Sequence, residues 1–134
     1  MATLANLTWE ELRQLQIAWV GWYGIVTVGF RLNDGQSCKA GAEQFGYSYN
    51  FDPNKKITRI ESIVDTDEKW IIRMNFYHRE EILVEVGFWD DYIEAHGGRI
   101  ENFEIADDEQ LIGCELYYNK EWFRGVRWLK IKLI

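Results

Sequence analysis

The sequence contains little of several residue types that mark common classes of protein. It has 2 cysteines, Cys38 and Cys114, and 1 proline among 134 residues. A small secreted scaffold usually carries more cysteines, so two reduced thiols are favoured over a disulfide. No apolar run approaches the ~18 residues of a transmembrane helix, and the first residues lack the basic and apolar segments of a signal peptide. We therefore expect a cytoplasmic protein with no membrane partner.

Groups that would support catalysis or metal binding are also scarce. The formal net charge is −7, and no basic stripe of the kind that binds nucleic acid is visible. The 2 histidines, His78 and His96, share no metal-site spacing with cysteines or carboxylates. No serine stands in a nucleophile elbow, and the acidic runs at 65–68, 90–91 and 107–109 lack the pattern of a calcium loop. The sequence therefore predicts a non-enzyme without metal, cofactor or nucleic-acid partner.

Aromatic and apolar residues are abundant, at 16% and 47% of the chain with 7 tryptophans, which is typical of one folded domain. One short helix is predicted at the start. Thr8 can cap it, Glu11 can close the capping box, and Leu7 and Leu12 occupy the positions of a hydrophobic staple. We expect this helix to fade near Gln16, which divides the chain into an extension, residues 1–16, and a domain, residues 17–134.

Beyond the helix, apolar residues recur with the period of two that predicts β-strands. The predicted strands are 25–32, 37–40, 57–64, 70–76, 82–88, 103–105, 112–118 and 129–133. Residues 89–98 are predicted to form a long loop. On the last strand we expect Leu129, Ile131 and Leu133 to face inward. The similar stretches "TDEKWI" (66–71) and "DDEQLI" (107–112) suggest repeated sheet-sized units. These features predict an antiparallel all-β fold.

Several of these stretches resemble the jacalin-related lectins. The segment "GGRIENFEIADDEQLIGCEL" (97–116) is similar to the closing strands and acidic turn of that family. The segment "RMNFYHREEILVEVG" (73–87) resembles the strand pair before them, while "ITRIESIVDTDEKWI" (57–71) and "VGWYG" (20–24) match earlier family segments more loosely. The resemblance implies a β-prism of three antiparallel Greek-key sheets.

The resemblance also implies sugar binding at one end of the prism, without metal or catalysis. The family uses a glycine-rich first loop and a last loop spelled glycine-x-x-x-aspartate. The matching last loop here consists of Glu121, Trp122, Phe123, Arg124 and Gly125. Because Gly125 stands at the aspartate position, a carboxylate would have to come from Glu121, or from Asp90 and Asp91.

A glycine pair, Gly97 and Gly98, precedes the closing strands. It could let backbone amides approach a ligand, or it could provide a positive φ at the start of a strand. Trp122 and Phe123 could form a platform for a sugar ring or a protein contact, and Trp122 could equally belong to the core.

Two functions follow from these observations. The first is a carbohydrate-binding module for a mannose-type or galactose-type glycan. The alternative is a structural or adaptor protein of an intracellular assembly that has kept the prism and lost sugar binding. The absent aspartate, the N-terminal helix and the 7 tryptophans favour this protein-binding alternative. Both leave room for a homo-oligomer.

Overall fold

The computed structural model describes residues 15–20, 28–32, 37–40, 47–52, 54–67, 70–118 and 123–132. The predicted N-terminal helix lies outside the described residues, except that Leu15 and Gln16 already belong to the first strand. The described chain is mostly β-strand with one short helix, and every strand pair is antiparallel. The prediction of an antiparallel all-β fold is confirmed.

The N-terminal third of the chain forms a four-stranded sheet. Its strands are β1 (Leu15–Val20), β2 (Val28–Leu32), β3 (Ser37–Ala40) and β4 (Tyr47–Asn50). They lie in the order β3-β2-β1-β4. The fourth strand returns to lie beside the first, which is the Greek-key arrangement.

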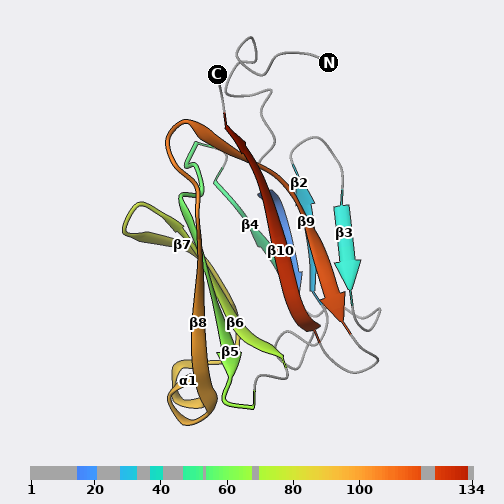
Figure 1. Ribbon diagram of the computed structural model, residues 1–134, viewed down its shortest axis with the longest axis vertical. Coiled ribbons are helices and arrows are strands. Elements are labelled where there is room, and N and C mark those ends of the chain that lie inside the picture. Colours follow the sequence, from blue (N-terminus) through green and yellow to red (C-terminus); the bar gives the residue numbers. More distant parts are fainter. Residues whose placement is uncertain are drawn as a thin grey trace.

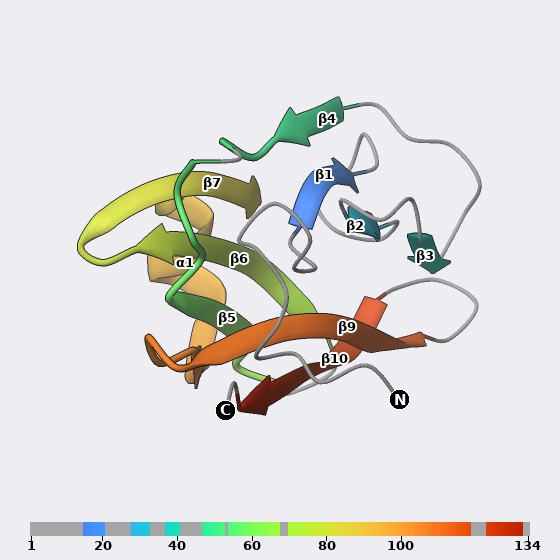
Figure 2. The ribbon, with the colours of Figure 1, turned by 90° about the horizontal axis from the view of Figure 1, so that it is seen from above.

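The middle of the chain repeats this arrangement. The strands β5 (Arg59–Asp65), β6 (Ile71–His78), β7 (Glu81–Gly87) and β8 (Gly97–Glu104) lie in the order β7-β6-β5-β8. The helix α1 (Asp90–His96) connects β7 to β8. The last two strands, β9 (Glu109–Tyr118) and β10 (Phe123–Lys132), form a hairpin of their own (Figure 1). Seen end on, the two four-stranded sheets and the hairpin surround a common interior (Figure 2).

One aromatic side chain from each sheet meets in this interior. Phe30 of β2, Phe76 of β6 and Trp128 of β10 are all buried. Their ring centroids are 6.0 Å apart for Phe30 and Phe76, 5.2 Å for Phe30 and Trp128, and 5.9 Å for Phe76 and Trp128. Phe51 packs edge-on against Phe76 at 5.1 Å. Edge-to-face packing is the favoured geometry for aromatic rings, so this cluster joins the three sheets.

Two sequence-based expectations about these segments are wrong. Residues 89–98 do not form a long loop, because Asp90–His96 is α1 and β8 begins directly at Gly97. Two aspartates in the first turn favour the helix through its dipole. The two similar stretches are not equivalent either: the turn at 66–67 joins β5 to β6 within one sheet, whereas the turn at 107–108 leads from β8 into the hairpin.

The inward face of the last strand also differs from the expectation. On β10 the buried residue is Trp128, with Val126 packed against the core beside it, whereas Leu129 and Ile131 are only half-buried. Both alternating sets on this strand contain apolar residues, so the period of two does not distinguish them. The large indole takes the interior position, since it removes more apolar surface from water. Leu133 lies outside the described residues.

Candidate functional site

The structure separates the residues of the predicted sugar site. Gly97 and Gly98 begin β8 at the end of α1, and Gly125 lies near the start of β10 in the hairpin. Figure 1 shows α1 and the start of β10 toward the same end of the molecule, but Figure 2 shows them apart from each other, on different sheets. Phe123 and Arg124 begin β10, but their side chains are not described, and Glu121 and Trp122 lie outside the described residues.

Gly97 and Gly98 have a packing role, which differs from both roles expected from the sequence, namely ligand approach and a positive φ. The φ of Gly97 is −70°, so no left-handed conformation is needed. A Cβ at Gly97 would lie 2.5 Å from the carbonyl oxygen of Ile93, and one at Gly98 would lie 2.9 Å from the Cα of Thr66. The amide of Gly97 donates to the carbonyl of Ile93 at the helix end. The pair therefore lets α1 run directly into β8 beside the β5–β6 turn.

A second candidate site lies at the N-terminal end of α1, which is the end away from Gly97 and Gly98. A cavity of about 270 Å³ opens there, lined by Arg73, Glu85, Val86, Gly87, Phe88, Trp89 and Asp90. Ligand cavities usually start near ~300 Å³, so this one suits a small group such as a single sugar ring. It includes Asp90, one of the carboxylates that could replace the missing loop aspartate. Gly97 is about 10 Å away along the seven-residue helix.

Aromatic rings form one wall of this cavity and continue onto α1. Phe88, Trp89 and Tyr92 will be called the aromatic ledge. The rings of Phe88 and Tyr92 stack with centroids 4.1 Å apart and an interplanar angle of 17°, and Trp89 stands at 70° to Phe88. Trp70 packs edge-on against Phe88, with ring centroids 5.3 Å apart. Trp89 is 67% exposed, which leaves an indole face open to solvent.

Gly87 is the residue that turns the chain into this ledge. Its φ is +121°, in the region that favours glycine. A Cβ here would lie 2.3 Å from the carbonyl oxygen of Ile72, the same oxygen that accepts the amide of Phe88 at 3.0 Å. Glycine therefore lets the end of β7 pass against β6 and presents Phe88 and Trp89 at the mouth of the cavity.

The floor of the cavity is polar and is organised by Arg73. Its side chain is only 11% exposed, and it forms ion pairs with Asp90 and with Glu85, the latter at 3.0 Å. Its Nε donates to Asn75 at 3.2 Å, and Asn75 donates in turn to Glu61 at 2.9 Å. Burial would lower the pKa of Arg73, but the hydrogen bond to Asp90 and the charge of Glu85 outweigh it and raise the pKa. The two ion pairs fix the orientation of the Asp90 and Glu85 side chains.

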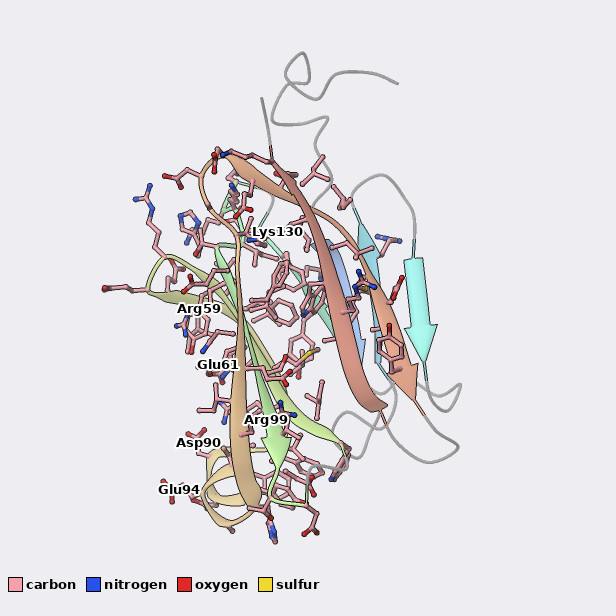
Figure 3. All side chains as sticks on the ribbon, in the orientation of Figure 1. Arg59, Glu61, Asp90, Glu94, Arg99 and Lys130 are labelled. Atoms are coloured by element: carbon pink, nitrogen blue, oxygen red, sulfur yellow. The ribbon has the colours of Figure 1, made fainter. Side chains whose placement is uncertain are left out.

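The network of hydrogen bonds and ion pairs that begins at Arg73 continues from Glu61 along the outer face of the sheet. Glu61 accepts from Arg59 at 3.5 Å, and Arg59 also donates to Asn102 on β8 at 3.1 Å. Figure 3 shows Arg59, Glu61 and Asp90 along this outer side of the sheet, with Glu94 next to Asp90 on α1. Residues four apart on a helix share a face, so Asp90 and Glu94 present their charges in the same direction.

The acidic turn at 107–109 has an internal partner. Lys56 Nζ donates to the carbonyl oxygens of Ala106 and Glu109, each at 2.6 Å, and Lys130 Nζ pairs with the carboxylate of Glu109 at 2.8 Å. Within the described ranges, no group of three or more histidine, cysteine or acidic residues could hold a metal ion. Lys56 and Lys130 therefore supply positive charge at this acidic turn.

A larger cavity of about 500 Å³ lies between β5, β8 and β10. Its inward side chains include Ile60, Phe103 and Trp128. It lies beside the core, and its lining residues Glu101 and Arg127 form only exposed ion pairs, with Arg99 and Glu115 respectively. Its aromatic residues are half-buried or buried, whereas Trp89 is 67% exposed, so the cavity at α1 is the better candidate.

Sequence reasoning named Asp90 but missed Arg73, Phe88, Trp89 and Tyr92. The run "FWDDY", residues 88–92, was the available signal, because it combines three aromatic rings with two carboxylates directly after a glycine. The chain matches no family model, no curated protein and no solved structure. In the part of the chain that the structure describes, no helix is long and apolar enough to cross a membrane.

Proposed function

We propose that this protein is a non-catalytic carbohydrate-binding module related to the jacalin-like β-prism. Two Greek-key sheets and a hairpin around one interior are the arrangement expected of such a prism with a shortened third sheet. The sugar would bind at the cavity beside α1 rather than at the loop that the resemblance implies. The observation that carries this proposal is the exposed indole of Trp89 beside the oriented carboxylate of Asp90.

The chemistry of the site suits a pyranose. The apolar C–H face of a sugar ring packs on an aromatic ring, and the open face of Trp89 is available for it. Sugar hydroxyls are donors, and a carboxylate accepts several hydrogen bonds. Asp90 uses one oxygen for Arg73, so acceptor capacity remains on an 83% exposed side chain. Because Arg73 fixes the carboxylate before the sugar arrives, less conformational entropy is lost on binding.

A glycan array with three proteins tests this proposal. We expect wild type to bind a defined glycan set, and Trp89→Ala to lose at least about tenfold in affinity at an unchanged melting temperature. Tyr117→Ala is the matched control, since Tyr117 is 51% exposed on β9 of the hairpin, in a different sheet from the strands that α1 connects. Trp122→Ala, measured on the same array, tests whether the loop 121–125 binds the sugar. Binding that is lost only in Trp122→Ala would move the site to 121–125.

The protein-binding alternative also has a specific observation behind it. Besides Trp89, the described surface exposes the side chains of Ile82, Ile100 and Tyr117 by 43%, 56% and 51%. Exposed aromatic and apolar residues are common at protein interfaces. A blank array from folded protein, together with a partner that is released by Trp89→Ala, would favour an adaptor over a lectin.

A further inference from the structure

We infer that the glycan recognised at α1 carries free ammonium groups, as a β-linked glucosamine oligomer does, and that neutral or acidic glycans bind more weakly. This inference rests on the proposed function and names the ligand class of the same site. It follows from the charges that surround the cavity and from the partners that they already have.

Among the described residues that line the cavity, Arg73 is the only basic one, and each of its three side-chain nitrogens already has a partner. Its Nη1, Nη2 and Nε are bound to Asp90, Glu85 and Asn75 respectively. These contacts use three of the five guanidinium N–H groups, and the side chain is only 11% exposed, so an anionic sugar that approached Arg73 would compete with the carboxylates of Asp90 and Glu85. Removing one partner of a partly buried ion pair is costly, so sulfated, sialylated or uronic-acid glycans are disfavoured.

Negative charge exceeds positive charge at the mouth of the cavity. Glu85 and Asp90 line it, with side chains 47% and 83% exposed. Asp91 and Glu94 are exposed on the same short helix, and Figure 3 shows Glu94 next to Asp90. Two carboxylates therefore line the cavity together with one guanidinium, and two more stand on the adjoining helix. An ammonium group on the ligand would meet an excess of acceptors, and the net charge of −7 would attract a cation from a distance.

The aromatic ledge adds to the same preference. A cation near an indole face is attracted by the electrons of the ring, most strongly for tryptophan. Trp89 stands at 70° to Phe88 and is 67% exposed, so its indole is open to a ligand from solvent. A glucosamine ring can place its C–H face on the indole and its ammonium group within reach of Asp90. A neutral hexose can use only the stacking contact and the hydroxyl hydrogen bonds.

Titration calorimetry with four ligands at low salt tests the inference. The ligands are a glucosamine tetramer with its amines protonated, its fully acetylated form, a neutral glucose tetramer with the same linkage, and trilysine. We expect the glucosamine tetramer to bind wild type at least about fivefold more tightly than either neutral tetramer. The difference should shrink as salt is added, because exposed charges are screened.

Two variants complete the test. Asp90→Asn keeps the shape of the side chain and removes its charge, so it should abolish the preference for ammonium groups while neutral tetramers still bind. Glu80→Gln removes an equal charge at the exposed β6–β7 turn, at the far end of β7 from α1, and should keep the full preference. A preference that survives in Asp90→Asn would overturn the inference.

The outcomes separate this inference from the proposed function. Neutral tetramers that bind as tightly as the glucosamine tetramer, in a manner that depends on Trp89, would refute the charge preference and leave the lectin proposal standing. Trilysine that binds as tightly as the tetramer would refute it too, by showing attraction to a cation without sugar recognition. No binding of any sugar would refute both.

Discussion

Replacing Phe76 by alanine should remove the contact that joins the three sheets. Phe76 is 0% exposed and packs edge-on against Phe30, Phe51 and Trp128, which lie on three other segments of the chain. Truncation of a fully buried phenylalanine costs about 3–5 kcal/mol, through lost burial and the cavity that remains. A domain is stable by only about 5–15 kcal/mol, so the variant should be close to unfolding.

Urea denaturation at 25 °C, followed by tryptophan fluorescence and by far-UV circular dichroism, measures this cost. We expect the midpoint to fall strongly in Phe76→Ala, while the dependence on urea concentration stays the same. The control is Tyr117→Ala, which truncates a half-exposed aromatic residue and should change stability by no more than about 0.5 kcal/mol.

Two results would refute the reasoning. A loss below about 1 kcal/mol in Phe76→Ala would show that the cluster does not hold the sheets together. Wild-type transitions that differ between the two probes would show that the sheets unfold separately, because a single cooperative core requires coincident transitions.

Two further predictions concern a turn and a carboxylate. Gly87→Ala should lower stability by about 1–3 kcal/mol, because its φ is +121° and the new Cβ would lie 2.3 Å from Ile72 O. The control is Gly113→Ala, which should be nearly neutral because no atom lies within 4 Å of the new Cβ. Equal melting temperatures for the two variants would contradict this prediction. The hydrogen bond from Lys130, with one from a backbone amide, lowers the pKa of Glu109 from 4.5. The folded pKa is therefore below the unfolded one, so this contribution is present above about pH 4.5 and is lost as the pH falls through the folded pKa. Stability measured by urea at several acidic pH values should fall less steeply in Glu109→Gln than in wild type, and identical slopes would count against this ion pair.

The sequence by itself determined that the chain forms short antiparallel strands. Alternation between apolar and polar residues is a local property, so it can be read without knowing the partners of a strand. The segment 37–40 was predicted with the bounds that β3 has, and the strands 57–64 and 112–118 correspond to β5 and β9. This local pattern does not show how the strands are ordered in sheets.

Tertiary structure decided which side chains face inward, because register shifts interrupt the period of two. A shift in the β6–β7 pairing between Phe76 and Tyr77 leaves Leu83 packed on the core and Ile82 43% exposed, although regular alternation would place Ile82 on the same face as the buried Val84. The segment "EILVEV" is apolar at both alternating positions, so it fits either register. A bulge exchanges the two faces of a strand, and only the pairing with the neighbouring strand shows where it lies.

The tertiary structure also decided which residues come together at the candidate site beside α1. The run "FWDDY" contains its rings and carboxylates, but Arg73 stands fifteen positions before Phe88 and reaches Asp90 only because β6 and β7 are paired. The exposure of Trp89 likewise depends on the turn at Gly87, where the backbone passes against β6 too closely for any side chain. Local pattern therefore determined the types of residue and the strands, whereas long-range pairing determined which of those residues meet.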